Sequence, residues 1–342
     1  MNDAIISPQP TAHSPHAVLV SEFWNSKNAS PFATVITAHY NRPNTIKRAM
    51  DSVEHQTFRD IEYIIIDDGS TNSSDEIIKT FMNETELPVM FIKQENNRGV
   101  HTARNLGVKY ARGKFLINLD SDDELLPRAC EIFHDAWDSI PDERKNQYAA
   151  IAHYICDVNG NLIGTNFPEN INLSSLEEIK KFGTKIIWDQ TNCWSIEIYR
   201  ANSLPEPHNI HFVSEVIQKI PLHQKYLLWF VPKTLRIYHT EGNEHLCNPF
   251  VTSVQGLKDE LWDIMYKVNH SDIFLPEMIR YLKYVLRYNM TVRIMRKFDP
   301  KYDPAFVKKY KLEGFKNKFW QCILFFPAML LTNTYKKKRC KF

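Results

Sequence analysis

The sequence predicts an α/β fold in which helices flank a mostly parallel central sheet, with a helical C-terminal extension. The first observation is that strand-like and helical patterns alternate along residues 32–119, which is typical of strand–helix–strand units with parallel strands. The second is that polar residues follow three of the strand-like runs, namely Tyr40-Asn41, Asp67-Asp68 and Asp120 to Asp123. The carboxyl ends of parallel strands meet at one edge, where ligands bind in such sheets, so the same pattern predicts a site there.

The first two strands are predicted at Phe32 to Thr37 and at Ile61 to Ile66. The second run is almost entirely apolar and rich in β-branched residues, which is typical of a strand covered on both faces. Between the two runs, residues 45–56 carry apolar side chains at helical spacing. The third and fourth strands are predicted at residues 89–92 and 115–119, with helices at residues 75–82 and 101–111.

The fourth strand ends in three carboxylates within four residues, Asp120, Asp122 and Asp123. Such carboxylates repel one another unless a cation or hydrogen-bond donors neutralise them. Mg²⁺ and Mn²⁺ prefer oxygen ligands, and Mg²⁺ usually takes one or two carboxylates together with substrate phosphates. One interpretation is therefore a metal–diphosphate site. The alternative is a solvated turn in which Asp123 caps a helix that starts near Glu124.

Composition places few other limits on function. A chain of 342 residues with 43% hydrophobic and 24% charged residues is ordinary for a globular protein of one large or two small domains. The net charge of +2 gives no overall case for nucleic-acid binding. The six cysteines have no zinc-like spacing, which favours free thiols in a reducing compartment. We see neither a secretory signal nor an apolar run long enough to span a membrane.

Three regions are expected. Residues 1–30 read as a partly disordered N-terminal extension, because they are rich in Pro, Ser, Asn and His. Residues 31–250 form the main domain, with a first half at 31–130 and a second half at 131–250. Residues 251–342 form a helical region that contains an apolar segment and a basic tail.

Four motifs in this order resemble those of inverting family-2 glycosyltransferases, which have the GT-A fold and use nucleotide-diphosphosugars. The motifs are Tyr40-Asn41-Arg42, Asp67-Asp68-Gly69-Ser70, Gly99 with Ala103-Arg104-Asn105, and Asp120-Ser121-Asp122-Asp123. The resemblance covers roughly residues 32–240 and is looser after residue 135. His39 and Ala38 differ from the residues that the family usually has there.

The resemblance assigns the first half to the donor. Tyr40 and Asp68 would hold the nucleotide base; the alternatives are that Tyr40 packs at a strand end and that Asp68 closes an Asx-turn. Arg104 would reach the ribose or diphosphate, or brace Asp120. Asn41, Arg42 and Ser121 complete the expected donor site.

The resemblance also assigns roles within the acidic motif. Asp120 would contact the ribose, and Asp122 would ligate Mn²⁺ or Mg²⁺ and thereby take part in catalysis. Asp123 would act as a helix cap or contact the acceptor. His239, in a segment like the family's closing segment, would approach the metal or diphosphate, although a lone histidine is more often structural.

The second half would supply the acceptor site and the base. Trp194 lies in a segment that would line the acceptor cleft, with core packing as the alternative. Glu215 aligns with the family's general base, while Ser214 replaces the acidic residue that usually precedes it. An inverting displacement needs a base that takes the proton of the acceptor hydroxyl. Asp189 is the second candidate, and Glu215 could instead be an ordinary first-turn glutamate.

The last 30 residues combine a short apolar stretch, Phe319 to Leu331, with the basic run Lys336 to Arg339. This combination suits peripheral contact with a membrane interface; the alternative is a helix that packs on the core and carries a solvated tail.

The sequence thus predicts a metal-dependent inverting hexosyl- or N-acetylhexosaminyltransferase. It would use a nucleotide-diphosphosugar as donor, with UDP expected over other nucleotides. Its acceptor would be a glycan or a lipid-linked glycan. The resemblance places it in bacterial polysaccharide or lipopolysaccharide synthesis at the cytoplasmic face of the inner membrane. The alternatives are a nucleotidyltransferase, whose Lys-bearing phosphate loop is not evident, and an inactive membrane scaffold. A dinucleotide-binding enzyme is disfavoured, since no GxGxxG follows the first strand.

Overall fold

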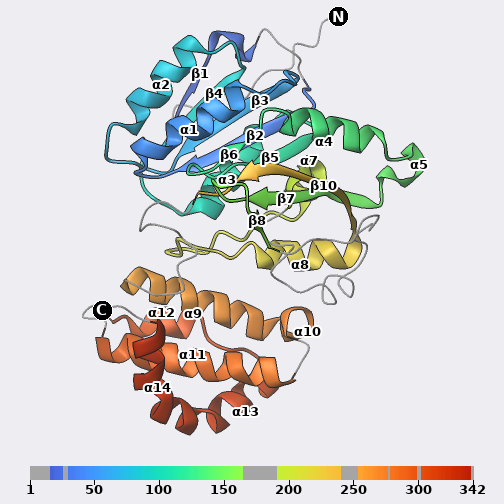
Figure 1. The fold of residues 1–342 in the computed structure, drawn as a ribbon. Coiled ribbons are helices and arrows are strands. Elements are labelled where there is room, and N and C mark those ends of the chain that lie inside the picture. The colour runs from blue at the N-terminus through green and yellow to red at the C-terminus, as the bar shows by residue number, and fades with distance from the viewer. Residues whose placement is uncertain are drawn as a thin grey trace, which may run out of the picture. The chain divides into compact units, whose positions relative to one another are not determined.

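The computed structural model describes residues 16–25, 30–164, 191–239, 253–275, 278–298 and 302–339. It divides into two compact units (Figure 1). The first unit comprises Met1–Ser203 and Tyr226–His239, and the second comprises Leu204–Lys225 and Thr240–Phe342. Residues 204–225 therefore belong to the second unit, although the sequence analysis assigned them to the main domain.

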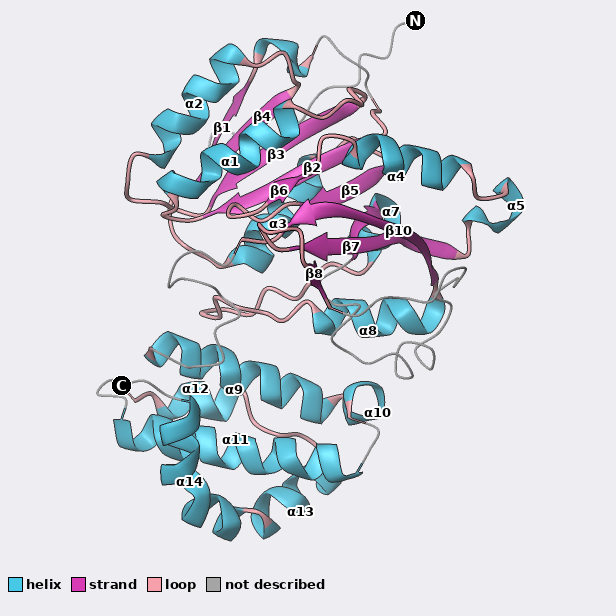
Figure 2. Ribbon diagram, in the orientation of Figure 1, coloured by secondary structure: helices cyan, strands magenta, loops and turns pink. Residues whose placement is uncertain are grey.

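The first unit is built on a mixed sheet (Figure 2). Its strands are β1 (His16–Val20), β2 (Ala33–His39), β3 (Ile61–Asp67), β4 (Val89–Gln94), β5 (Phe115–Asn118), β6 (Glu124–Leu125), β7 (Tyr148–Cys156), β8 (Leu162–Ile163), β9 (Thr191–Ser195) and β10 (Leu227–Ile237). Their order across the sheet is β1-β4-β3-β2-β5-β9-β7-β10-β6, and β8 pairs with β7.

The predicted parallel half of the sheet is confirmed. Strands β4, β3, β2 and β5 are mutually parallel neighbours. In the β2–β3 register His39 lies opposite Asp67, so the loops that follow these two strands leave the same edge. Strand β1, which lies within the predicted N-terminal extension, pairs antiparallel with β4.

Helices cover both faces of this half. They are α1 (Pro43–Glu54), α2 (Ser74–Glu84) and α3 (Val100–Tyr110). The first unit also contains α4 (Ala129–Asp138), which packs against β7 and β10, together with α5 (Asp142–Lys145), α7 (Ile196–Ala201) and a 3₁₀ turn η1 (Glu22–Trp24) near the start. Successive strand residues face opposite sides: Val35 joins the core cluster that contains α1, whereas Ile36 faces α3. A Cβ atom on Gly107 would lie 2.7 Å from Cδ1 of Ile66, so glycine allows α3 to lie close to the sheet.

The second half of the sheet is mixed. Strand β9 is antiparallel to β5 and β7, and β7 is parallel to β10. Residues 124–125 form the short strand β6, which pairs with residues 236–237 of β10. The helix that Asp123 would cap in the alternative interpretation is therefore not formed, because this segment is extended and bonded to β10.

The second unit is helical. It contains α8 (Val216–Lys225), α9 (Val254–Asn269), α10 (Ser271–Phe274), α11 (Met278–Phe298), α12 (Pro304–Lys309), α13 (Phe315–Ile323) and α14 (Phe325–Arg339). Helix α11 packs against α9, α13 and α14, and its buried Tyr281, Val285 and Tyr288 belong to one core cluster with Leu261 of α9. The expectation of C-terminal helices is confirmed. None of the helices in the described ranges is long and apolar enough to cross a membrane.

Candidate functional site

The acidic loop follows β5 at the carboxyl edge of the sheet. The N–H of Leu119 still donates to the carbonyl of Ile36 in β2 (2.9 Å), and the N–H of Asp123 then donates to the carbonyl of Asp120 (3.1 Å). The chain therefore turns back sharply just beyond the sheet. As predicted, the turn places the carboxylates beside the loop that follows β2.

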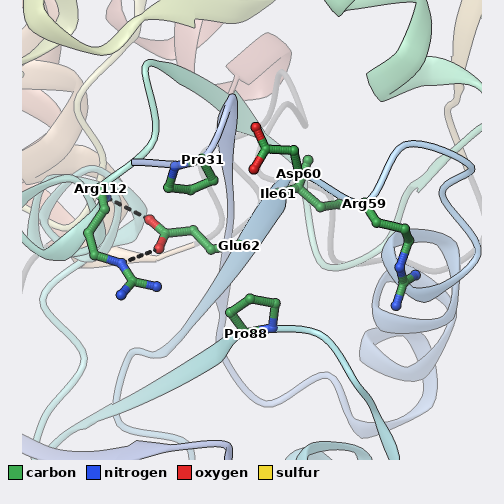
Figure 3. Close-up of a pocket in the computed structure, with 7 residues that line it drawn as sticks. All are labelled: Pro31, Arg59, Asp60, Ile61, Glu62, Pro88 and Arg112. Atoms are coloured by element: carbon green, nitrogen blue, oxygen red, sulfur yellow. Dashed lines mark hydrogen bonds and ion pairs between the residues drawn. The ribbon is translucent and has the colours of Figure 1, made fainter. Parts of the chain in front are cut away.

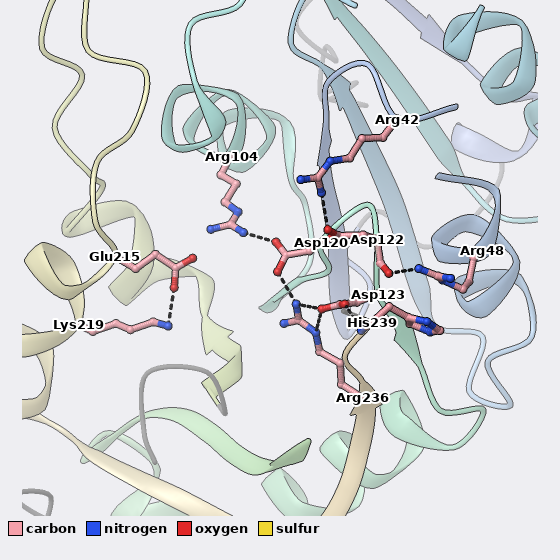
Figure 4. A network of polar contacts seen from close by, with 10 residues as sticks. All are labelled: Arg42, Arg48, Arg104, Asp120, Asp122, Asp123, Glu215, Lys219, Arg236 and His239. Atoms are coloured by element: carbon pink, nitrogen blue, oxygen red, sulfur yellow. Dashed lines mark hydrogen bonds and ion pairs between the residues drawn. The ribbon is translucent and has the colours of Figure 1, made fainter. Parts of the chain in front are cut away.

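Arg236 links two of these carboxylates (Figure 4). Its guanidinium, from the end of β10, forms ion pairs with Asp120 and Asp123, and its Nε donates to Oδ2 of Asp123 at 2.7 Å. Arg104 of α3 pairs with the other oxygen of Asp120 at 2.5 Å. The bracing contact considered for Arg104 is therefore present, and Asp120 lies between two guanidinium groups.

Asp122 is held by the segment that follows β2. Arg42 donates to Oδ2 of Asp122 at 2.6 Å, and Arg48 of α1 donates to the main-chain carbonyl of Asp122. The motif residues Arg42 and Asp122, which are 80 positions apart in the sequence, are thus in direct contact. A hollow of about 470 Å³ beside this loop is lined in part by Arg48 and Glu124.

The pKa values of Asp120 and Asp123 are shifted in opposite directions. Desolvation acts to raise the pKa of Asp120, but Arg236 and Arg104 outweigh it and hold that pKa below its usual range. Burial raises the pKa of Asp123 despite the opposing effect of Arg236, and the like charge of Asp120 adds to the rise. The sequence analysis required a cation or hydrogen-bond donors to neutralise the repelling carboxylates, and guanidinium groups act as those donors.

His239 lies beside this loop at the end of the first unit. Its N–H donates to Oδ1 of Asp123 at 3.0 Å, and its Nε2 lies 2.8 Å from Oε1 of Glu124. Its buried Nδ1 has no hydrogen-bond partner among the described residues. A histidine with one ring nitrogen on a carboxylate and the other unpartnered has the arrangement of many metal-ligating histidines.

The described side chains near the acidic loop could supply only part of the coordination shell of a metal ion. Within them, no group of three His, Cys, Asp or Glu side chains is arranged to hold an ion. One or two protein carboxylates, completed by substrate phosphates and water, are the usual arrangement for Mg²⁺ in phosphate-binding enzymes. Asp122 offers such a carboxylate, and the ring nitrogen of His239 is a further candidate donor.

Asp68 closes the loop between β4 and α3. Its Oδ1 accepts from Nε2 of Gln94 (2.7 Å) and from the N–H of Arg98 (2.9 Å), and its Oδ2 accepts from the N–H of Gly99 (2.7 Å). These contacts differ from the Asx-turn considered for Asp68, because Asp67 is the residue that accepts from the N–H of Ser70 (2.7 Å). Oδ2 of Asp68 has capacity for a second hydrogen bond. Burial raises the pKa of Asp68 to about 6.

We expect Asp68→Asn to flatten the pH dependence of stability between about pH 4 and about pH 6. In this range folded Asp68 keeps a proton that the unfolded chain, with a pKa of 3.8, has released. Stability therefore falls as pH rises through this range, by up to about 3 kcal/mol. Urea unfolding at several pH values measures it. Asp259 of the second unit, with a pKa also raised to about 6, contributes its own part of the pH dependence, and the variant retains that part. Identical pH slopes of stability for variant and parent would contradict the prediction.

Tyr40 and Asn41 lie on the loop after β2. Asn41 has a φ of +52°; its Oδ1 accepts from the N–H of Thr71 (2.9 Å), and its own N–H donates to Oγ of Ser70 (2.8 Å). The loops after β2 and β3 are thus fastened together. Tyr40 is 42% exposed, so its ring is accessible for contact with a ligand.

The family comparison agrees with this geometry. A model of glycosyl transferase family 2 matches residues 34–194, just under half of the chain. The chain carries a family-2 glycosyltransferase domain. The matched range contains all four motifs that carry the resemblance stated above, and that resemblance is confirmed.

Relatives of the family-2 domain are found among curated proteins and solved structures. An uncharacterized glycosyltransferase of Methanocaldococcus jannaschii is 33% identical over 154 residues, which are 44% of this chain and 51% of that protein. The chain thus matches about half the length of this relative, and still less of the next two.

Two solved structures share the GT-A fold with this chain. S. aureus TarS 1–349 in complex with UDP-GlcNAc has a TM-score of 0.51 at 16% identity, over 90% of this chain and 92% of that one. The mannosyltransferase PcManGT of Pyrobaculum calidifontis, in complex with GDP-Man and Mn²⁺, has a TM-score of 0.50 at 12% identity, over 90% and 88%.

The residues expected on the acceptor side are dispersed. Trp194 is 1% exposed in β9, which favours core packing over a cleft surface. Asp123 has no exposed surface and is held by Arg236 and His239, so it braces the loop. Asp189 lies outside the described residues.

Glu215 lies in the second unit, directly before α8. Its carbonyl accepts from the N–H groups of Gln218 (3.0 Å) and Lys219 (2.9 Å). Its carboxylate, 39% exposed, pairs with the buried ammonium of Lys219 at 2.5 Å (Figure 4). The structure thus places Glu215 at the start of a helix.

The sequence analysis missed Arg236 and Arg48. The signal for Arg236 was a single arginine within the apolar run of residues 234–238, since a cation there needs an acidic partner if the strand is buried. Arg48 carried no such signal, because a basic residue on an amphipathic helix is ordinary.

Another hollow, of about 360 Å³, is lined by residues at the amino end of β3 (Figure 3). Its buried Glu62 pairs with Nε of Arg112 at 2.6 Å and accepts from Oγ1 of Thr34 at 2.6 Å. Strand β3 runs from Ile61 to Asp67, so this hollow lies at the opposite end of the strand from Asp67 and is separate from the candidate site.

Proposed function

We propose that this protein is a metal-dependent inverting glycosyltransferase that transfers a hexosyl or N-acetylhexosaminyl group from a nucleotide-diphosphosugar. The observation that carries the proposal is the acidic loop, which lies at the carboxyl edge of a family-2 domain and is organised by arginines from the loop after β2, from α3 and from β10. These arginines preorganise the loop for a ligand that carries phosphates.

The donor would bind across the loops that follow β2, β3 and β5. The exposed ring of Tyr40 would contact the base, with Asn41 holding the loop and Asp68 offering Oδ2 to the base imide. Asp120 and Ser121 would face the ribose, while Arg42 and Arg104 would favour the diphosphate. UDP is the first candidate because S. aureus TarS, which shares the fold, is solved with UDP-GlcNAc.

Mn²⁺ or Mg²⁺ would be held by Asp122 and His239. PcManGT, which shares the fold, is solved with Mn²⁺. When bound, the ion supplies Lewis-acid stabilisation of the negative charge that develops on the leaving diphosphate. The chain itself orients this pair: Arg42 fixes the carboxylate of Asp122, and Glu124 fixes the tautomer and orientation of the His239 ring.

Glu215 would act as the general base. Its carboxylate lies 2.5 Å from the ammonium of Lys219, and an ionised carboxylate is the form that accepts a proton from the attacking hydroxyl. The proposed acceptor is a glycan or lipid-linked glycan of bacterial surface polysaccharide synthesis, met at the cytoplasmic face of the inner membrane.

Nucleotide release from a panel of UDP-, GDP- and CMP-sugars, with Mn²⁺, Mg²⁺ or EDTA, tests this function. We expect slow hydrolysis of one donor, its loss in EDTA, and at least about a tenfold higher Mn²⁺ requirement in Asp122→Asn. Asp142→Asn, on exposed helix α5, is the matched control and should behave like the parent. No release and no metal-dependent nucleotide binding with any donor would overturn the proposal and favour an inactive scaffold.

A further inference from the structure

Helices α13 and α14 expose large apolar side chains. Six of them have at least 44% of their surface exposed: Phe319, Ile323, Phe325, Phe326, Leu330 and Leu331. We call this set the apolar face. Scattered single apolar residues are normal on a protein surface, whereas a set concentrated on two consecutive helices marks an interaction site.

The packing of α14 is the reverse of that of an ordinary surface helix. From Phe325 to Thr332, the part of the helix whose burial is described, the buried positions hold the small side chains Ala328 (0% exposed) and Thr332 (5%). The Thr332 hydroxyl donates to the carbonyl of Ala328. The larger Phe326 and Leu330 point outward, at 66% and 72% exposure. Helix α13 likewise buries Asn317, which accepts from the Tyr281 hydroxyl at 2.7 Å, while it exposes Phe319. The side chains of the apolar face thus keep a large exposed surface, although Arg293 of the same unit lies over the ring of Phe325.

The charge on the same two helices is of one sign. Residues 315–339 contain no acidic residue and six basic ones: Lys316, Lys318, Lys336, Lys337, Lys338 and Arg339. The first two lie in the opening turns of α13, and the other four lie at the end of α14. The apolar residues are therefore bracketed in sequence by basic ones, a composition typical of helices that lie in the interface of an anionic bilayer.

We propose that the apolar face docks on a bilayer surface rich in anionic lipid. Since none of the described helices can span a membrane, the apolar side chains would enter the headgroup region with the helices lying along it. A second copy of this chain fits less well, because a two-fold contact would bring the same basic segments together without acidic partners. The inference extends the proposed function by naming the docking surface and its lipid chemistry.

Vesicle co-sedimentation of the full chain tests the inference without requiring catalysis. We expect the protein to sediment with vesicles of phosphatidylcholine and phosphatidylglycerol, and far less with phosphatidylcholine alone or at high salt. Phe326→Ser/Leu330→Ser should lower this binding at least about tenfold. Val158→Ser, which changes an exposed apolar residue of the first unit, is the control. Phe326, Leu330 and Val158 are all exposed, and circular dichroism checks that each variant keeps its fold.

Several outcomes would overturn the inference. These are no binding to anionic vesicles, equal binding to both vesicle types, or unchanged binding of the double variant. Loss of a dimer in sedimentation velocity, without a change in vesicle binding, would assign the apolar face to self-association. Donor hydrolysis in vesicle-free solution reports on the proposed function separately, so the two can fail independently.

Discussion

Replacing Arg236 with methionine is expected to lower the free energy of unfolding of the first unit by about 3–5 kcal/mol. Arg236 is buried and pairs with both Asp120 and Asp123. Methionine fills much of the volume but leaves Asp123, which has no exposed surface, without its cation. Removing one partner of a buried ion pair is costly because the remaining charge has lost both its water and its counter-charge. Urea unfolding, monitored by tryptophan fluorescence, measures the loss.

Two further variants make this prediction specific. Arg128→Met removes the exposed arginine that pairs with Glu131, and surface pairs of this kind contribute little, so its unfolding midpoint should stay close to that of the parent. Adding Asp123→Asn to Arg236→Met should recover part of the stability, because the uncompensated charge is then absent. An Arg236→Met protein as stable as the parent would show that the ion pairs contribute nothing to the fold.

Glu215→Gln is expected to lower the rate of sugar transfer by about 10²–10⁴-fold, with little change in donor binding. Glutamine keeps the size of the side chain but cannot take the proton of the acceptor hydroxyl. Its amide also cannot form the ion pair with Lys219. Steady-state transfer to a chosen acceptor measures the rate, and calorimetric titration with the nucleotide measures donor affinity.

Glu313→Gln, at an exposed position of the same unit, is the matched control and should retain the parent rate. Glu215→Asp should restore part of the activity, because a carboxylate is kept one carbon shorter. Full activity of Glu215→Gln would exclude Glu215 as the base. The second candidate, Asp189, would then be the residue to substitute.

The parallel half of the sheet could be predicted because its signals are local. The apolar run at Ile61 to Ile66 and the helical spacing at residues 45–56 each lie within a dozen residues, and the polar loops follow directly from where the strands end. The positions of β2, β3 and β5 and the convergence of Asp68 with the acidic loop at one edge therefore needed no knowledge of distant contacts.

The rest of the site depends on pairings that no local pattern encodes. Strand β6 exists because two residues pair with the end of β10, more than a hundred positions away. The same register brings Arg236 to the acidic loop, so a reading of Asp123 as a helix cap could not be rejected from sequence. Trp194 is similar: its environment is set by strands β5 and β7 on either side of β9, and its own sequence segment fits a cleft equally well.

The contact between β10 and the acidic loop also has a consequence for the order of folding. Arg236 is 113 residues beyond Asp123 in the chain, so the loop is translated long before its counter-charge. Contacts of such long sequence separation form late, because closing the intervening chain costs entropy first. The parallel half can thus assemble during synthesis with its carboxylates still repelling one another, and the site reaches its final charge balance only when β10 is added to the sheet.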